Sequence, residues 1–297
     1  MMDWIVFGKT PLEGDFVRDN LRSPVGVAFF RWLSDAVGSA GHWAKRLPPT
    51  GVKFVLGLRA HPGSLRVGVM VPSRDKVGRE FPLVACLEGP RDALARKYPA
   101  VPVAWSSCLS AARAILDEGR AAPIGECAQR LKDLPNLPPL DDSYSRVAHA
   151  LCVASSADFH ERLFADVEHD PHYAYQTVRV AAQTIGKATA PALLCPIASP
   201  TDVVAWLELV RRVAPTSDFV PSFLWTGGER PSVIICLDDP PPAILPVLGG
   251  DAGEAARVWP LSTNNQVALQ KARTSIAPLL PPPTAPFEAV IEALSGR

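Results

Sequence analysis

The connections between several apolar segments of this chain are short, and their length restricts the kind of β-sheet that it can form. Residues 53–60 and 65–72 are separated only by His-Pro-Gly-Ser, and residues 222–227 and 232–238 meet through a Thr-Gly-Gly-Glu-Arg-Pro turn. A parallel crossover needs about a dozen residues or more, whereas these connections have the length and composition of hairpins. The sequence therefore predicts a central sheet that is largely antiparallel or mixed.

Amphipathic segments alternate with these strand candidates. Residues 199–213, for example, place apolar side chains at helical spacing after a start signature that runs from Ser199 to Asp202. Ser23 is expected to begin another helix and Gly119 to end a third. Helices interleaved with short antiparallel strands indicate an α/β fold in which helices cover a central sheet, in layers of the α/β/α kind. The remaining strand candidates are residues 4–8, 82–88 and 190–197, and the remaining helix candidates are residues 23–40, 103–119 and 155–168.

Proline, with 31 residues, marks the expected joints of the chain. It clusters at 131–142, 237–246 and 277–286, and such clusters interrupt regular structure because proline lacks a backbone donor and disfavours helix just before it. The first cluster divides the chain into an N-terminal unit of residues 1–132 and a C-terminal unit of residues 143–297, unless the two form one continuous domain. The last cluster makes the C-terminal end a proline-rich extension with a final short helix.

The charge balance argues against nucleic acid as a ligand. Thirty basic residues offset thirty acidic residues, whereas nucleic-acid binders gain affinity from a basic excess or stripe. The six cysteines lie mostly in apolar runs without a Cys-x-x-Cys pair, which is typical of buried thiols in a reducing compartment. The N-terminus lacks a signal-peptide pattern, and no stretch reaches the roughly 20 apolar residues of a membrane helix. We therefore expect a soluble, cytoplasmic protein without membrane insertion.

The stretch Gly8-Lys9-Thr10 has the ending of a phosphate-binding loop but not its context. The motif requires a glycine where the chain has Asp3, and a helix N-terminus where the chain has Pro11. The residues between form a hydrophobic strand instead of a loop. No nucleotide or other cofactor is therefore expected.

Other patterns of catalysis or metal binding are also weak. His160, His169 and His172 lie in one region, but the Asp170-Pro171 pair interrupts the continuous helix that a zinc site with ligands four residues apart would use. There is no Gly-x-Ser-x-Gly elbow for a serine nucleophile. These patterns indicate neither catalytic residues nor a metal site.

Two polar segments carry apolar residues that an ordinary surface loop does not need. Residues 8–20 follow a buried strand with Gly, Pro, Gly and Asp in close succession, and residues 72–82 connect two strands and are highly charged. Apolar side chains within charged loops indicate loops folded onto the sheet edge, which present rigid polar groups for recognition. The apolar residues are Phe16, Val17, Val77 and Phe81.

In their order and spacing, the two segments resemble the signatures of the TagF family, also called ImpM, of type VI secretion accessory proteins. The first signature has the form Gly-Lys-x-Pro-x-x-Gly-Asp-Phe and is matched by Gly8, Lys9, Pro11, Gly14, Asp15 and Phe16. The second has the form Pro-Ser-x-Asp-x-Val-Gly-Arg-x-Phe-Pro and is matched by Pro72, Ser73, Asp75, Val77, Gly78, Arg79, Phe81 and Pro82.

The resemblance covers residues 1–90 closely and residues 215–250 more loosely. A helix that contains Trp32 lies between the two signatures, as in the family. At the later hairpin, Leu224-Trp225 stands where many members have paired tryptophans. The resemblance implies an adaptor without catalytic activity that restrains the type VI secretion machine after translation. Its implied partners are type VI secretion components, namely a forkhead-associated scaffold protein and the threonine kinase and phosphatase branch that acts with it.

The signature residues have expected roles in a partner-binding surface. Gly14 is expected to allow a backbone turn that a side chain would obstruct, and Asp15 is expected to cap or bond the loop. Lys9 and Arg18 are interpreted as surface charges, available to a partner or to a salt bridge with an acidic residue. The acidic candidates are Asp75 and Glu80, and the whole surface consists of Lys9, Gly14, Asp15, Phe16, Arg18, Ser73, Asp75, Gly78, Arg79 and Phe81.

Two other interpretations stay open at this point. In one, the chain is a hydrolase or another small-molecule enzyme, whose site lies near Asp15, Ser73 and Asp75 and includes one of the histidines. That interpretation requires a deep pocket with a strongly perturbed carboxylate or histidine. In the other, the signature residues only close the sheet edge, and Asp15 and Arg79 lie buried against each other.

Overall fold

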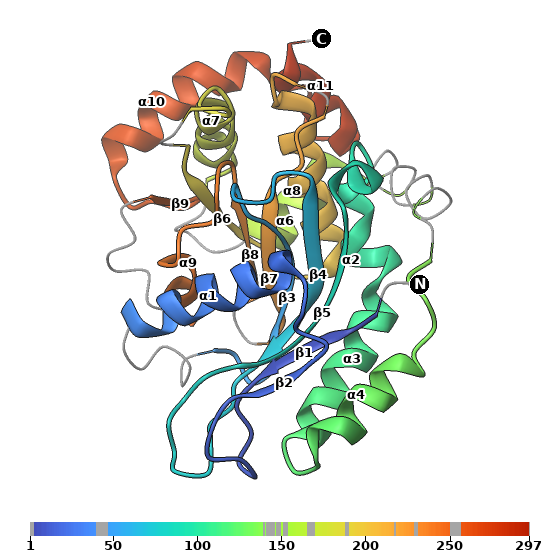
Figure 1. The fold of residues 1–297 in the computed structure, drawn as a ribbon. Coiled ribbons are helices and arrows are strands. Elements are labelled where there is room, and N and C mark those ends of the chain that lie inside the picture. The colour runs from blue at the N-terminus through green and yellow to red at the C-terminus, as the bar shows by residue number, and fades with distance from the viewer. Residues whose placement is uncertain are drawn as a thin grey trace.

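A single nine-stranded sheet runs through the part of the chain that the structure describes (Figure 1). The computed structural model describes residues 3–39, 47–138, 140, 146, 150, 154–164, 170–187, 190–216, 218–228, 231–249 and 257–296. The strand order is β2-β1-β5-β4-β3-β7-β8-β6-β9. The strands are β1 (Ile5–Gly8), β2 (Val17–Asp19), β3 (Val52–Gly57), β4 (Ser64–Val71), β5 (Leu83–Pro90), β6 (Ala192–Pro196), β7 (Ser222–Thr226), β8 (Ser232–Cys236) and β9 (Val258–Pro260).

The predicted sheet is confirmed in its direction and in its two hairpins. Every neighbouring pair of strands is antiparallel except β6 and β9, which are parallel. The short turns join β3 to β4 and β7 to β8, as their length requires. Strand β3 also pairs with β7, with Val52 opposite Thr226, so strands from both parts of the sequence share one sheet.

Helices cover both faces of this sheet, which gives the expected α/β layers. Helix α1 (Pro24–Ser39) and the short α9 (Ile244–Leu248) pack on one face, and Figure 1 shows α1 crossing it. The remaining helices are α2 (Val101–Ala104), α3 (Ser106–Gly119), α4 (Ile124–Lys132), α6 (Ser156–Phe164), α7 (Pro171–Ala182), α8 (Pro200–Val213), α10 (Gln266–Ile276) and α11 (Phe287–Ser295), with 3₁₀ turns at Arg91–Leu94, Tyr98–Ala100 and Ala277–Leu279.

Side chains of each strand divide between two apolar cores because successive residues point to opposite faces. In β3, Phe54 and Leu56 pack under α1, whereas Val55 packs against the opposite layer. A sheet covered on both faces needs nearly continuous apolar strands, and all six residues of β3 except Lys53 are buried. Within the described residues, every helix is too short or too polar to span a lipid bilayer.

Local sequence signals predicted the starts of two helices correctly, whereas the glycine at the end of a third has a different role from the one expected. Helix α8 begins with the predicted capping box, in which Asp202 Oδ2 accepts the Ser199 amide at 2.7 Å. Ser23 Oγ likewise accepts the Gly26 amide at 2.9 Å at the start of α1. Gly119 does end α3, but its role is different from the expected cap. A Cβ atom there would lie 2.9 Å from the Cys127 Sγ, so glycine lets α4 approach α3 closely.

Helix α7 was not predicted, because its first residues resemble a break. Asp170 caps it, accepting the His172 amide at 2.8 Å, and Pro171 occupies the first helical position. The expected helix at 155–168 is seen as α6 up to Phe164, and its last four residues lie outside the described ranges. Five of the cysteines are buried free thiols, and Cys152 also lies outside these ranges.

A partly buried histidine is expected to make the stability of this fold sensitive to mild acid. His160 Nε2 lies 2.6 Å from the Tyr175 hydroxyl, and burial, with a contribution from the charge of His172, lowers the His160 pKa to about 4. The unfolded chain takes up this proton near pH 6.5, so the stabilisation is complete above that pH and is lost as the pH falls toward 4.

We expect the free energy of unfolding to fall by about 2 kcal/mol between pH 7 and pH 5, as measured by urea denaturation at each pH. Replacing His160 with Gln is expected to flatten this dependence. An equally steep fall in the His160→Gln variant would assign the effect to other groups.

Candidate functional site

The two signature segments meet at one end of the sheet. Residues 8–20 run from the end of β1 through a loop into β2, and residues 72–82 connect β4 to β5. Because β1 and β4 both lie antiparallel to β5, they end on the same side, and the two loops extend together beyond the sheet (Figure 1). These segments are called the signature loops below.

Asp75 binds the two signature loops together from the inside. Its buried carboxylate accepts hydrogen bonds from Lys9 Nζ at 2.9 Å and Arg79 Nε at 2.7 Å. The backbone amides of Val77 and Arg79 also donate to it, at 3.1 and 2.8 Å. Burial by itself raises the pKa of Asp75, but the Lys9 and Arg79 hydrogen bonds outweigh it and hold the pKa well below its usual range. The carboxylate is therefore charged at neutral pH and acts as a structural anchor.

The position of Lys9 is the main difference from the expected partner-binding surface. Lys9 was interpreted as a surface charge, but it is only 6% exposed, and its ammonium group is the buried partner of Asp75. Its backbone carbonyl accepts the Ser73 hydroxyl at 2.7 Å, so both ends of the residue join the two loops. Asp75, 66 residues away in the sequence, is one of the two acidic partners that the sequence suggested for Lys9, but the sequence placed the pair at the surface.

Backbone contacts complete the connection between the loops. The Lys76 amide donates to the Glu13 carbonyl at 2.8 Å, and the Arg79 guanidinium donates to the Gly14 carbonyl. Gly78 adopts φ +88° in the turn that follows Asp75.

Gly14 differs from expectation, because a Cβ atom there would meet nothing within 4 Å. Asp15 is exposed and accepts the neighbouring Phe16 amide at 2.7 Å, a local bond of the expected kind.

An aromatic cluster anchors the first loop to α1. The Phe16 ring meets Phe81 edge-on with centroids 4.8 Å apart and Phe30 at 5.2 Å, and such pairs add to the burial energy. Arg18 is exposed, and its guanidinium lies 4.7 Å from the Phe30 centroid, so it covers the cluster from the solvent side. Phe16, Arg18 and Phe81 therefore belong to one packed unit.

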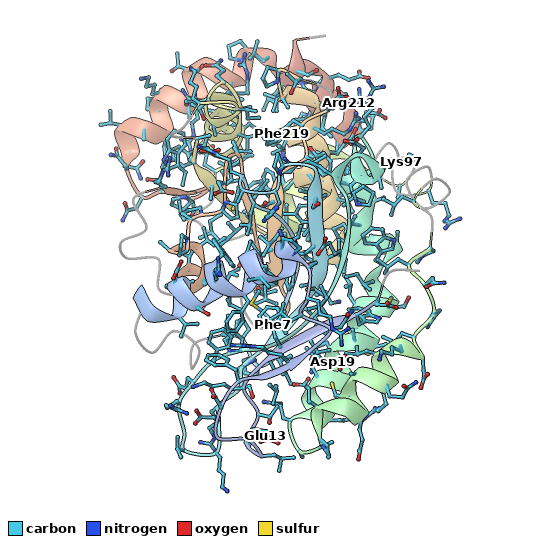
Figure 2. All side chains as sticks on the ribbon, in the orientation of Figure 1. Phe7, Glu13, Asp19, Lys97, Arg212 and Phe219 are labelled. Carbon is cyan, nitrogen blue, oxygen red and sulfur yellow. The ribbon has the colours of Figure 1, made fainter. Side chains whose placement is uncertain are left out.

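The outermost residues of the signature loops are exposed although their backbone is fixed. Leu12 is 49% exposed and Val77 is 70% exposed, and Glu13 and Lys76 lie beside them in the bonded loops. Figure 2 shows Glu13 at the outer end of the molecule. These four residues are called the apex below. The apex presents two apolar side chains flanked by charges of opposite sign.

Gly8 allows the close approach of the two signature loops, and this gives a test. It has φ +141°, and a Cβ atom would lie 2.2 Å from the Pro82 carbonyl oxygen. We expect Gly8→Ala to lower the free energy of unfolding by about 3 kcal/mol or more, because both backbone strain and a backbone clash oppose it. Urea denaturation measures the change. Gly14→Ala is the matched control, with space for its methyl group, and equal stability of the two variants would contradict the proposed packing.

A hollow of about 590 Å³ lies beside the signature loops, between them and the end of α3. Ser73, Glu80 and Arg120 line it among the described residues, but Asp15 and Asp75 do not. His160 lies on α6, away from this hollow. The structure therefore does not bring Asp15, Ser73, Asp75 and His160 together.

The interpretation in which Asp15 and Arg79 lie buried against each other also differs from the structure. Asp15 is exposed, and Arg79 donates to Asp75 instead.

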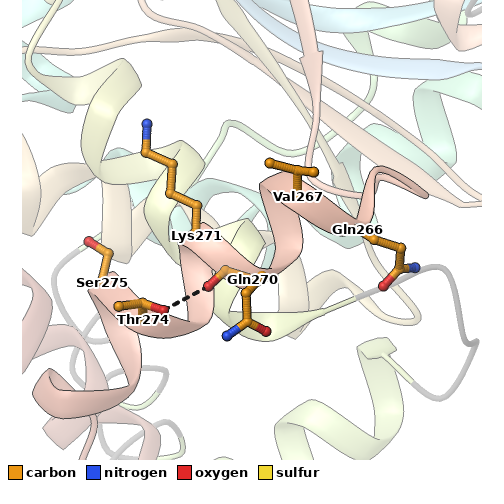
Figure 3. A pocket seen from close by; sticks show the side chains of 6 residues that line it. All are labelled: Gln266, Val267, Gln270, Lys271, Thr274 and Ser275. Carbon is orange, nitrogen blue, oxygen red and sulfur yellow. Dashed lines mark hydrogen bonds between the residues drawn. The ribbon is translucent and has the colours of Figure 1, made fainter.

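The hollow on α10 carries still less chemistry. A depression of about 590 Å³ follows one exposed face of α10 and is lined by amide, hydroxyl and single apolar or basic side chains (Figure 3). Among the described residues, no three His, Cys, Asp or Glu side chains gather closely enough to hold a metal ion, and His169 lies outside those residues.

One of the comparisons with known proteins covers the part of the chain that contains the signature loops. Residues 6–134 match the model of the TagF N-terminal domain, described as type VI secretion system-associated. Proteins with curated descriptions give no match to the sequence. The fold is similar to that in the crystal structure of PA0076 from Pseudomonas aeruginosa PAO1, with a TM-score of 0.50, 17% identity, and coverage of 87% of this chain and 99% of that one. Residues 6–134 are therefore similar to the TagF N-terminal domain, a domain associated with type VI secretion systems.

Proposed function

We propose that the chain is a non-catalytic adaptor of the type VI secretion system that binds another protein through the apex of the signature loops. The observation that carries this proposal is the fixed backbone beneath exposed apolar side chains, with Asp75 buried and Val77 70% exposed. An ordered loop loses little conformational entropy when a partner docks, so its apolar contacts contribute more of their energy to affinity.

The proposed partner is a forkhead-associated scaffold protein of the secretion system, acting with its threonine kinase and phosphatase branch. The association of the N-terminal domain family with type VI secretion supports this choice. The apex also has the character of a protein interface, in which an apolar centre is surrounded by charged groups. Binding in the cytoplasm would restrain assembly or firing of the machine.

The state of the polar signature residues supports an adaptor over a hydrolase. A general base needs a lone pair directed at its substrate and a pKa near the working pH. Asp75 instead directs its oxygens at four donors of its own chain, and these hold its pKa low. The Ser73 hydroxyl donates to the Lys9 carbonyl.

Affinity capture from the lysate of its own cells, read by mass spectrometry, tests this function. We expect the forkhead-associated scaffold protein to be recovered with the native chain and lost with Val77→Asp. Val267→Asp is the matched control, because Val267 is 79% exposed on α10, far from the signature loops in sequence. Recovery of the scaffold by all three proteins would place the interface elsewhere, and recovery by none would exclude the proposed partner.

A further inference from the structure

A third cavity lies at the junction of the two sequence halves. It has a volume of about 270 Å³ and opens where β3 begins and β7 ends. Lys53, Ser110 and Arg113 line it from the N-terminal part, and Trp225 and the residues before α8 line it from the C-terminal part. This junction pocket is lined by residues of β3, α3 and β7 and by the segments that precede α8 and follow β7.

The charges of the junction pocket are unbalanced. Among the described lining residues, Lys53 and Arg113 are cationic and none is acidic. Lys53 Nζ donates to the Ser110 hydroxyl at 2.9 Å, which is a neutral partner. Arg113 bonds Asp117 at 2.8 Å, but the same carboxylate also bonds Arg120 at 2.8 Å. The Asp117 carboxylate is therefore shared between the guanidinium groups of Arg113 and Arg120. Lys53 adds a further positive charge.

The environment of the pocket also lowers the pKa of Lys53. Burial lowers the pKa of its ammonium group, and the nearby charge of Arg113 lowers it further. Nearby like charges disfavour the charged form of Lys53, and an anion bound between Lys53 and Arg113 would offset this repulsion. An ordinary surface lysine has neither the burial nor the cationic neighbour.

The walls of the pocket are fixed and partly aromatic. Trp225 lies opposite Lys53 in the β3–β7 register, and its side chain is 4% exposed. The Thr50 hydroxyl donates to the Gly227 carbonyl at 2.9 Å and thereby holds the β7–β8 turn against the start of β3. An indole beside a lysine and an arginine provides an apolar surface next to an anion site. The volume corresponds to a ligand smaller than a typical drug molecule.

We propose that the junction pocket binds a small anionic metabolite. Its phosphate or carboxylate group would lie between Lys53 Nζ and the Arg113 guanidinium, with its apolar part against Trp225. Both cations suit oxyanions, lysine as a compact charge and arginine as a fork of donors. Because the pocket includes both halves of the sequence, a bound anion would stabilise their junction. This inference is independent of the proposed adaptor function.

Titration of the full-length protein with inorganic phosphate, phenyl phosphate and benzoate tests the proposal, with chloride keeping the ionic strength constant. The readouts are tryptophan fluorescence and the thermal unfolding midpoint. We expect saturable binding of at least one of the three anions, and the preferred one identifies the oxyanion class. Lys53→Met is expected to weaken binding at least 10-fold, whereas Lys53→Arg retains most of it. Lys271→Met, at an exposed lysine of α10, is the control and is expected to bind as the native chain does.

Two results would overturn the inference. One is the absence of saturation with all three anions, or a titration that Lys53→Met leaves unchanged. The other concerns Glu229, which the sequence places in the β7–β8 turn, outside the described residues. Binding that occurs only in a Glu229→Gln variant would show that the chain fills the pocket with its own carboxylate.

Discussion

Replacing Asp75 with asparagine is expected to separate the signature loops while the sheet stays folded. Lys9, which is 6% exposed, would lose the carboxylate that balances its charge, and the Arg79 guanidinium would lose the same partner. A buried cation without its counter-ion is strongly unfavourable, so the loops would open to hydrate it. We expect the thermal midpoint to fall by roughly 5–10 °C. Amide hydrogen exchange should show lost protection at residues 9–16 and 72–80.

Asp15→Asn is the matched control for this substitution. Asp15 is exposed and accepts only a neighbouring amide, so the same change of charge should leave the thermal midpoint within about 1 °C. A double variant, Lys9→Met with Asp75→Asn, removes the uncompensated cation and should recover part of the loss. If Asp75→Asn proves as stable as Asp15→Asn, the carboxylate does not hold the loops together.

The stability that Asp75 contributes changes over a lower pH range than the stability that His160 contributes, because folding lowers the pKa of Asp75. A carboxylate whose pKa is depressed by folding stabilises the fold above its unfolded pKa near 3.9, and the stabilisation disappears as the pH falls below that value. The signature loops should therefore stay protected from exchange between pH 7 and pH 5. The fall in global stability expected from His160 occurs within that same interval.

An acidic residue at the apex is expected to remove partner binding without affecting the fold. Val77 is 70% exposed and Leu12 is 49% exposed, so neither side chain is needed for the core. In an interface, each would be desolvated against the partner, and an aspartate there would bury an unpaired charge. We expect Val77→Asp and Leu12→Asp each to weaken affinity for the purified forkhead-associated scaffold by about 30- to 100-fold, or roughly 2–3 kcal/mol. Isothermal titration calorimetry measures this directly.

The control for the apex variants has the same chemistry at a different surface. Val267 on α10 is 79% exposed, against 70% for Val77, so Val267→Asp introduces the same charge on a valine of similar exposure. All three variants should keep the native thermal midpoint within about 2 °C. Equal affinity of Val77→Asp and Val267→Asp for the scaffold would contradict an interface at the apex.

Local signals predicted most of the central fold. The short connections fixed the antiparallel direction of β3–β4 and β7–β8, and the Ser199 to Asp202 signature marked the start of α8 correctly. The edge strands β2 and β9 were missed because three residues carry no periodicity. Helix α7 was missed because a proline after Asp170 resembles a break, although proline at the first helical position is favourable.

The candidate site was predictable in its location but not in its internal arrangement. The motifs identified both signature loops, but sequence alone placed Lys9 at the surface, because burial depends on which distant residue a side chain meets. Asp75 stands 66 positions away and becomes a neighbour only when β1 and β4 end on the same side of the sheet. The junction pocket has the same origin, since Lys53, Arg113 and Trp225 belong to no common motif.

The most direct test of an interface at the signature loops is amide hydrogen exchange of the chain alone and in complex with the purified forkhead-associated scaffold. We expect complex formation to slow exchange at residues 10–16 and 74–80, with little change along α10. Slowing confined to α10, to the β7–β8 turn or to other surfaces, with the signature loops unchanged, would contradict an interface at the apex.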